Sequence, residues 1–375
     1  MGQLSALRNF LHETLTRPVV AALIGSRLIV LGAAVLAELL PGRTTILTSG
    51  SSAPLLASLT SWDGWYYVGI ARDGYHSLPV AGAYHDYAFL PGYPALVALC
   101  SLGQSALMAL MAVILSNALF VLALALLIRV SEPVVGRDVA VRSAVLLALC
   151  PFGAVFSMAY GESLFLALSL GAFLAAQRDR RALTGVLLGL AALTRLQGIL
   201  LIIPLGLIFL LRDRRLRVSL TWLALGPAAV AAFIGYVAIL SGSLDGYSSA
   251  MAAWGRGGAS VARSSSDTVA SALSGPYVAY FLLLLFVLAA GVFLLGWLRW
   301  DRIPLPYALL PVLYLGAAFA SGGLESIGRY LMLAFPYAWI LAGRRNRLVA
   351  WGLPLIGAVS LFVISFASYR GFFVP

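Results

Sequence analysis

The sequence predicts an all-α polytopic membrane protein that forms one integral membrane domain over residues 1–375. Hydrophobic residues make up 61% of the chain and charged residues only 10%, whereas soluble proteins carry about 25% charged residues. Apolar runs recur along the chain at the length that a bilayer crossing needs, about 20 residues. This composition excludes a soluble enzyme with an anchor, a disordered protein and a secreted disulfide scaffold.

The arginines predict how the chain is oriented in the membrane. All 25 basic residues are arginine, and the formal net charge is +11. They form short clusters between apolar runs rather than one basic face, so we expect no nucleic-acid partner. With the N-terminus inside, 17 arginines fall in cytoplasmic segments and 5 in external ones, as the positive-inside rule expects. We therefore expect a multi-pass protein of the cell membrane, surrounded by membrane lipids, whose loops 41–88 and 241–275 are extracytoplasmic.

Apolar runs mark the expected spans in chain order. The run 18–40 is followed by no small-residue cleavage site, so we expect the first span there rather than a cleaved signal. The core helices are expected within 89–240, and the C-terminal helices within 276–375, after the Ser/Gly-rich loop 241–275. Further spans are expected at 106–128, 143–159, 162–176, 218–240, 276–298, 303–320, 327–342 and 348–367.

Two apolar segments depart from a simple crossing. The segment 89–103 is short and contains Pro91 and Pro94, so we expect it to lie at the interface or to re-enter the membrane, where protein covers its backbone. The stretch 183–211 is too long for one span and is interrupted by Thr-Arg-Leu-Gln-Gly at 194–198. We expect a broken hairpin, with two shorter arms that meet at Arg195.

The external loop 41–88 and the residues that follow it combine aromatic and charged side chains. Nine aromatic residues lie between Trp62 and Tyr93, together with three aspartates, two histidines and Arg72. An aromatic belt at the membrane interface would explain the aromatic residues, but not the charged ones. Aromatic faces beside carboxylates suit a sugar, whose C–H faces stack on rings and whose hydroxyls form hydrogen bonds. We expect a sugar site here, with the belt as the alternative.

Asp63, which two tryptophans flank, is the candidate catalytic base. A carboxylate that is partly desolvated at the membrane boundary binds a proton more strongly. A helix N-cap or a solvated surface aspartate is the alternative interpretation. Asp73 lies in Arg-Asp-Gly-Tyr, which is typical of a turn. His85 and Asp86 either polarise a substrate hydroxyl or pair with each other.

Two arginines are candidate phosphate ligands, because a guanidinium can hold phosphate through two parallel hydrogen bonds. Arg195 lies at the break of the hairpin. Arg329 lies four residues after Glu325, so an ion pair between these two at helical spacing is the alternative. Glu162 lies at an external tip between apolar runs, where an acid is costly and is expected to be functional. A glutamate that the helix dipole stabilises is the alternative there.

Several catalytic motifs are missing from the sequence. It contains no Walker pattern, no His-Glu-x-x-His and no Cys/His cluster. It also contains no Gly-x-Ser-x-Gly elbow. We therefore expect no nucleotide site and no cofactor and assign no metal ligand, while a divalent metal is left open.

Four stretches carry a joint pattern in a fixed order. They are Trp62-Asp63 with I-A-R-D-G-Y (70–75) and A-F-L-P-G-Y-P (88–94), C-P-F-G-A-V-F-S-M-A-Y-G-E-S-L-F (150–165), A-A-L-T-R-L-Q-G (191–198), and G-R-Y-L-M-L-A-F-P (328–336). Together they resemble the membrane mannosyltransferases of the GT-C superfamily. The likeness is strongest to the branch that contains the second mannosyltransferase of GPI-anchor synthesis, PIG-V, and its bacterial relatives.

The resemblance implies a GT-C-type bundle of about 10–12 transmembrane helices with a large first extracytoplasmic loop. It also implies an inverting enzyme that moves mannose from polyprenyl-phosphate mannose to a hydroxyl of a lipid-linked or cell-envelope glycan, outside the cytoplasm. In that scheme Asp63 is the base, although Gly64 follows it where many superfamily members have a second acid. The expected substrate-binding residues are Trp62, Arg72, Tyr75, His85, Asp86, Glu162, Arg195, Gln197, Glu325 and Arg329.

A secondary transporter or lipid flippase is the main alternative. Such a protein would place carboxylates at mid-span between paired discontinuous helices. Here the carboxylates gather in one external loop, and the broken hairpin has no partner. A noncatalytic membrane scaffold is the third possibility, against which the cost of placing Arg195 and Glu162 at the membrane argues.

Overall fold

The computed structural model describes residues 2–41, 53–78, 84–212, 216–254, 303–320, 327–343 and 347–372, with shorter stretches at 288, 290–292 and 296. This part of the chain is mostly helical and contains no β-strand. Four of its helices are long and apolar enough to cross a membrane, namely Arg17–Leu39, Ser105–Val135, Leu220–Ser241 and Ala350–Tyr369. The predicted all-α polytopic membrane protein is therefore confirmed, while the number of crossings stays a prediction.

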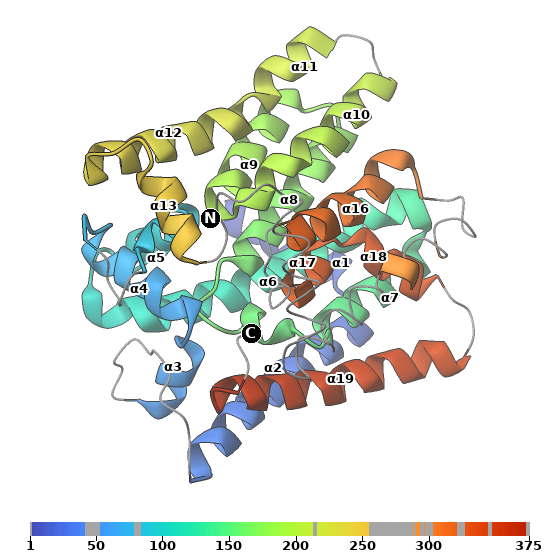
Figure 1. Cartoon of the computed structure of the whole chain (residues 1–375). Coiled ribbons are helices and arrows are strands. Elements are labelled where there is room, and N and C mark those ends of the chain that lie inside the picture. The colour runs from blue at the N-terminus through green and yellow to red at the C-terminus, as the bar shows by residue number, and fades with distance from the viewer. Residues whose placement is uncertain are drawn as a thin grey trace.

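The helices follow one another in a single bundle (Figure 1). In chain order they are α1 (Gly2–Thr14), α2 (Arg17–Leu39), α3 (Pro54–Leu59), α4 (Asp63–Asp73), η1 (Asp86–Ala88), α5 (Gly92–Cys100), α6 (Ser105–Val135), α7 (Arg137–Ala148), η2 (Gly153–Phe156), α8 (Glu162–Gln177), α9 (Arg181–Thr194), η3 (Leu196–Leu201), α10 (Ile202–Arg212), α11 (Leu216–Leu223), α12 (Leu225–Ser241), α13 (Gly246–Ala253), α16 (Leu305–Ala320), α17 (Ile327–Leu333), α18 (Pro336–Ala342) and α19 (Arg347–Tyr369). The η elements are short 3₁₀ helices.

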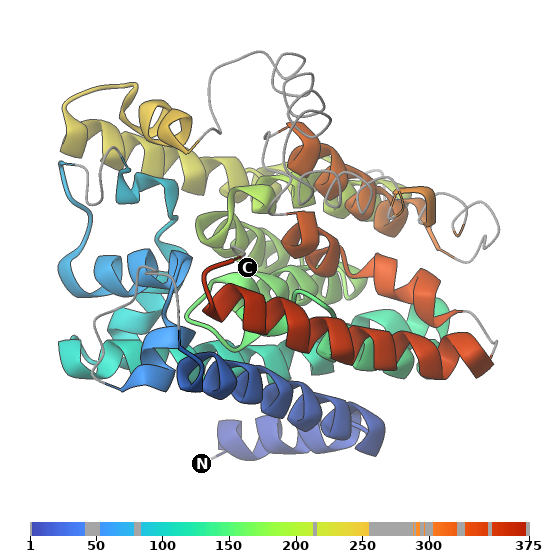
Figure 2. The same ribbon diagram turned by 60° about the horizontal axis from the view of Figure 1, so that its bottom comes forward.

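The long helix α6 lies in the middle of the packing. It contacts α7 and α8, α8 contacts α9, and α9 contacts α12. On another side of the bundle α19 lies along α2, as the red and blue helices show in Figure 2. Aromatic side chains fill the interior, for example Phe120 and Phe156, whose rings stack with centroids 4.1 Å apart. The buried Trp339 indole donates a hydrogen bond to Ser131 Oγ at 2.6 Å, so this polar group is satisfied inside the bundle.

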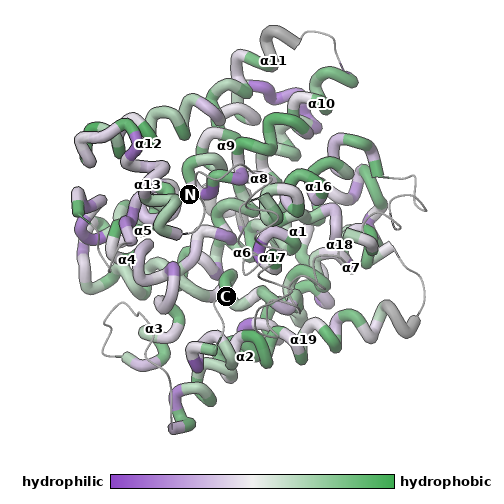
Figure 3. The backbone as a smooth tube through the Cα atoms, viewed as in Figure 1, coloured by the Kyte–Doolittle hydropathy of each residue, from purple (hydrophilic) through white to green (hydrophobic). Residues whose placement is uncertain are grey.

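The outer surface is apolar, as a lipid-facing surface must be. Large apolar side chains point outward on α12 and α19, with exposed fractions of 85% for Ile239, 80% for Trp351 and 67% for Leu355. In Figure 3 hydrophobic residues follow most helices, while hydrophilic residues gather near α4. A lipid environment accounts for this arrangement, because water would disfavour so large an exposed apolar surface.

Two predicted spans are each divided in the structure, and one short segment is as expected. The expected span 143–159 is wrong as one helix, because α7 ends at Ala148 and Pro151 and η2 follow. The expected span 327–342 is also two helices, since Pro336 lacks the N–H that would continue α17 into α18. The segment 89–103 contains only the nine-residue α5, about 14 Å long at 1.5 Å per residue, which is too short to cross a bilayer, as predicted.

The predicted interruption of the stretch 183–211 is present as a break between two helical segments. α9 ends at Thr194, Arg195 has an extended backbone (φ −147°, ψ 136°), and η3 and α10 then continue the chain. Residues 42–52, 79–83, 255–287 and 321–326 lie outside the described residues. Most of the expected span 276–298, most of the loop 241–275 and the whole of Glu325 therefore lie outside as well.

The bundle has two chemically distinct ends (Figure 1). The helices α3, α4, α5 and α13 lie together at the left of the view. The end of α10 and the start of α19 lie toward the right. Arg212 belongs to the right-hand end, where its Nη1 donates to the main-chain oxygen of Gln177 at 2.9 Å. α4 and Arg212 thus lie at opposite ends of the described part of the bundle, although the side of the membrane that each faces stays a prediction.

Candidate active site

Asp63 is the first residue of α4, and its main chain is fixed by two other parts of the fold. Trp62 precedes it with a positive φ of 59°, which is rare for a residue with a side chain. The Trp62 indole donates to the main-chain oxygen of Ser368 on α19 at 3.2 Å. The Asp63 N–H donates to the hydroxyl of Tyr160 at 3.2 Å. A helix N-terminus also favours an anionic side chain.

Arg329 on α17 is the principal partner of Asp63. Its Nη1 donates to Asp63 Oδ2 at 2.5 Å, and its guanidinium carbon lies 5.9 Å from the centre of the Tyr160 ring. The Arg329 side chain is 5% exposed, whereas that of Asp63 is 18% exposed. The base candidate therefore remains accessible, while its cation is held inside the protein.

A second pair continues this network. Glu162, the first residue of α8, is fully buried and forms an ion pair with Arg195. Glu162 Oε1 also lies 3.5 Å from Arg329 Nη1. Two carboxylates and two guanidiniums thus alternate in a chain whose formal charge is zero. Because each buried charge has an opposite partner, the network can exist in a low-dielectric interior.

Two glycines of the sequence motifs allow the backbone to assemble this network. A Cβ on Gly198 would lie 2.5 Å from the main-chain nitrogen of Ala192, so η3 can fold back on α9 only with glycine at this position. A Cβ on Gly92 would lie 2.7 Å from Thr194 Oγ1, so the start of α5 can approach the end of α9 closely. The break that presents Arg195 is therefore held by close backbone contacts on both sides.

A cavity of about 420 Å³ opens beside the network, a size typical of small-molecule sites. Asp63, Arg195 and Arg329 contribute its charged groups, and Gln197 a neutral amide. The full lining consists of Asp63, Tyr67, Ala88, Phe89, Leu90, Thr194, Arg195, Leu196, Gln197, Ile199, Leu200, Tyr247, Met251, Ala317, Arg329 and Tyr330. We call this space the phosphate cavity, because its two guanidiniums suit an anion and its walls are largely apolar.

Several predicted site residues lie elsewhere. Trp62 is bound to α19 and does not line the phosphate cavity. Tyr75 donates its hydroxyl to the main-chain oxygen of Phe89 at 2.6 Å, so it fixes the loop. Arg72 lies at the far end of α4 and pairs with Asp73 at 2.7 Å. Glu325 lies outside the described residues, and the observed partners of Arg329 are Asp63 and Glu162.

The end of α4 explains the Arg-Asp-Gly-Tyr sequence. Asp73 is the last residue of the helix, and Gly74 follows with φ 77°, a conformation that favours glycine. The predicted turn is thus present. The Arg72 guanidinium, through its hydrogen bonds, holds the pKa of the Asp73 carboxyl below its usual value.

The alternative in which His85 and Asp86 pair with each other is wrong. Asp86 Oδ2 lies 2.9 Å from Nδ1 of His76 and accepts the His76 main-chain N–H at 3.0 Å. His85 stacks on the Tyr87 ring instead, with centroids 4.9 Å apart. The histidine ten positions away, rather than the adjacent one, therefore binds the aspartate.

Sequence reasoning missed Tyr160 and Tyr67. Tyr160 lies two residues before Glu162, in a stretch whose motif was recognised, and holds the main chain of Asp63. Tyr67 follows Asp63 by four residues, so a helix at this position would place both on one face. Among the described residues, no group of three or more His, Cys, Asp or Glu side chains is arranged to hold a metal ion.

The chain matches a known protein family over a range that includes much of this site. The family model described as Mannosyltransferase (PIG-V) matches residues 21–234, more than half of the 375-residue chain. No curated protein matches the chain. The matched range contains Asp63, Glu162 and Arg195, whereas Arg329 lies beyond it.

Proposed function

Because the chain belongs to the PIG-V mannosyltransferase family, it is a membrane glycosyltransferase that transfers mannose, and we propose that its donor is polyprenyl-phosphate mannose. Family membership favours this activity over a transporter or a lipid flippase. The proposal further assigns the phosphate cavity to the donor, and it places the reaction on the extracytoplasmic side of the cell membrane.

One observation carries the proposal, namely two buried guanidiniums and one accessible carboxylate on the same cavity. Arg195 and Arg329 can each offer two parallel N–H groups to a phosphate. Asp63 lies next to them, where a sugar attached to that phosphate would place its anomeric carbon. The apolar part of the lining suits the first segment of a lipid chain.

Asp63 and the two arginines have separate roles in the proposed reaction. Asp63 Oδ1 accepts the proton of the acceptor hydroxyl, while Oδ2 stays bound to Arg329. The hydroxyl oxygen forms a bond to the anomeric carbon as the bond between that carbon and the phosphate oxygen breaks. The electron pair goes to the phosphate, whose charge Arg195 and Arg329 stabilise. Since the hydroxyl attacks opposite the phosphate, a β-linked donor gives an α-mannoside.

The placement of the site supports an extracytoplasmic reaction. α4 lies at the end of the bundle opposite the end of α10, where Arg212 begins a cluster that the positive-inside rule places in the cytoplasm (Figure 1). A polyprenyl-phosphate sugar carries its own membrane anchor, so it can enter from the bilayer. The acceptor we propose is a hydroxyl of a lipid-linked or cell-envelope glycan.

The test uses purified protein in lipid nanodiscs with polyprenyl-phosphate mannose, labelled in the sugar, and a lipid extract as acceptor source. We expect label to move to a glycolipid product, and Arg195→Ala to weaken donor binding. GDP-mannose, supplied without the lipid donor, is the control and should give no product. Transfer from GDP-mannose, or no transfer from the lipid donor, would contradict the proposal.

A further inference from the structure

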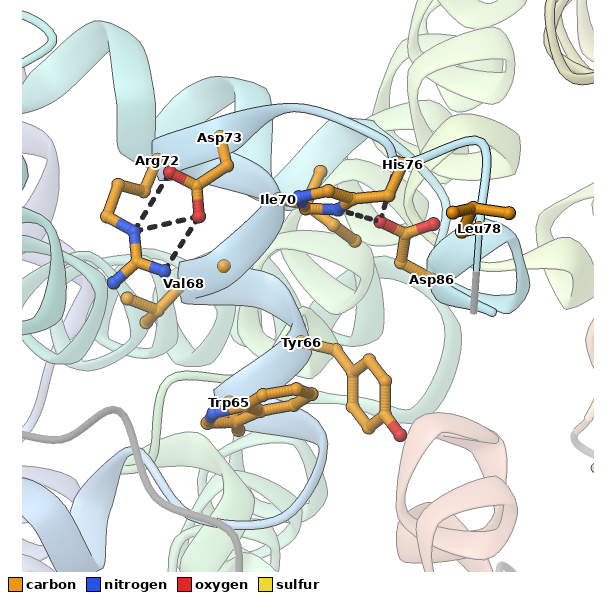
Figure 4. A pocket seen from close by; sticks show the side chains of 10 residues that line it. Trp65, Tyr66, Val68, Ile70, Arg72, Asp73, His76, Leu78 and Asp86 are labelled. Carbon is orange, nitrogen blue, oxygen red and sulfur yellow. Dashed lines mark hydrogen bonds and ion pairs between the residues drawn. The ribbon is translucent and has the colours of Figure 1, made fainter. Parts of the chain in front are cut away.

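A second cavity lies on the other side of α4, and its volume is about 360 Å³ (Figure 4). Asp63 and Tyr67 line the phosphate cavity, whereas the intervening Trp65 and Tyr66 line this second one. α4 has 11 residues and is therefore only about 16 Å long. The two cavities thus share one short helix as a wall, and the candidate base stands at its first residue.

The basic groups of the second cavity are each paired with a carboxylate of its own lining. Arg72 is engaged by Asp73 through three hydrogen bonds of 2.7 to 3.0 Å. His76 is bound to Asp86. In Figure 4 these two pairs lie above the aromatic side chains. The lining thus offers charges that are paired within it, together with carboxylate oxygens that can accept hydrogen bonds.

The Asp86 carboxylate has one oxygen that can accept a further hydrogen bond. Its side chain is only 3% exposed, and both hydrogen bonds from His76 go to Oδ2. Oδ1 is buried and has no hydrogen-bond partner among the described residues. A buried carboxylate oxygen without a donor is unfavourable, and a hydroxyl of a bound ligand would satisfy it.

Trp65 and Tyr66 supply a rigid aromatic floor. Their rings meet edge to face with centroids 4.8 Å apart. Tyr66 also stacks on Phe89 at 4.5 Å, which fixes its ring. An aromatic surface beside a carboxylate acceptor matches the two faces of a hexose, since its C–H groups stack and its hydroxyls donate.

We propose that the second cavity binds neutral hexose units of the acceptor glycan, and that their position presents the acceptor hydroxyl to Asp63. This inference rests on the proposed function and adds the class of acceptor, a neutral oligosaccharide rather than a bare lipid or a phosphorylated sugar. The buried Asp86 Oδ1 beside the aromatic floor of Trp65 and Tyr66 is the basis for the assignment.

The binding test uses saturation-transfer NMR on the protein in nanodiscs, with α-mannobiose as the probe. We expect saturation of the disaccharide ring protons in the wild type. Asp86→Asn should weaken binding roughly tenfold or more, as the loss of a hydrogen bond to a charged group does. Trp65→Ala should also weaken binding, because it removes the aromatic face on which the sugar stacks. Trp351→Ala and Asp245→Asn are matched controls on exposed residues and should leave binding unchanged.

Two further arms make the outcome decisive. Polyprenyl phosphate, which should fill only the phosphate cavity, is expected to leave the mannobiose signal intact, and its displacement of the disaccharide would overturn the assignment. Each variant is also compared with the wild type in donor binding, which a misfolded protein would lose. Trp65→Phe keeps an aromatic face and should restore most of the affinity that Trp65→Ala loses.

The proposed function can fail separately. If the wild type transfers no mannose, the donor assignment is wrong, while the disaccharide experiment still reports on the second cavity. If transfer is normal and mannobiose binds all variants equally, the acceptor assignment is wrong. Preferential binding of inorganic phosphate at the second cavity would also overturn it.

Discussion

Arg329 and Asp63 are 266 positions apart in the sequence, yet the Arg329 Nη1 donates to Asp63 Oδ2 at 2.5 Å. The same nitrogen lies 3.5 Å from Glu162. One guanidinium therefore connects the candidate base on α4 with the buried acid on α8. A donor phosphate in the cavity would meet this cation beside the base, so phosphate binding and base positioning depend on one side chain.

The Asp63–Arg329 pair should contribute to stability as a unit. Arg329→Ala leaves carboxylates without their shared cation, and breaking such a buried pair typically costs about 3–5 kcal/mol. We expect a lower midpoint of thermal unfolding in detergent, and a smaller drop when Asp63→Asn is added, because the unpaired charge is then removed. If the loss in the double variant equals the sum of the losses in the two single variants, the two residues are not coupled.

Arg195→Lys should weaken donor binding without unfolding the protein. Lysine keeps the positive charge that Glu162 needs, but it lacks the planar fork that holds phosphate at two points. The measurement is the affinity for polyprenyl phosphate, with the unfolding midpoint as the control for folding. If both Arg195→Lys and Arg195→Ala bind the lipid phosphate as the wild type does, Arg195 has no part in the donor site.

Gly198→Ala should disturb the break that presents Arg195. The added Cβ would lie 2.5 Å from Ala192 nitrogen, and overpacking of this kind costs about 1–3 kcal/mol. We expect lower stability together with weaker donor binding. Gly235→Ala is the matched control, because nothing lies within 4 Å of its added Cβ and alanine favours a helix by up to about 1 kcal/mol. Equal behaviour of the two variants would contradict the close contact.

The orientation in the membrane can be tested by cysteine labelling of intact cells. In a chain whose Cys100 and Cys150 are replaced by serine, Ser243→Cys should react with an impermeant reagent and Asp179→Cys should not. Both positions are exposed, and they lie on connections that the arginine distribution places outside and inside, respectively. Labelling at Asp179→Cys alone would reverse the proposed topology.

Helices and helix breaks that depend on neighbouring residues could be predicted from the sequence. Membrane-length apolar runs predicted the long helices, and the interruption at Arg195 predicted the broken hairpin. The predicted spans followed hydropathy and ignored the prolines within them. Pro151 and Pro336 therefore lie at breaks in two segments that were expected to be continuous helices. Hydropathy measures burial from water, whereas helix ends depend on backbone hydrogen bonds that proline cannot donate.

The sequence motifs named residues that the fold brings together, but not the pairs that these residues form. Asp63, Glu162, Arg195, Gln197 and Arg329 were all expected at a substrate site, and the fold brings them to one network and cavity. Which carboxylate meets which cation depends on the packing of α4, α8 and α17, which no local spacing encodes. The same holds for Asp86, whose partner is His76 rather than the adjacent His85.

The central claim is that Asp63 accepts the proton of the acceptor hydroxyl, and turnover of Asp63→Asn tests it most directly. Asparagine keeps the size of the side chain but cannot take the proton, and a positioned base contributes about 10²–10⁴-fold. We predict a variant that folds, binds polyprenyl phosphate and transfers mannose at least about a hundredfold more slowly, while Asp245→Asn keeps wild-type turnover. Asp63→Asn protein with near wild-type turnover would contradict the account.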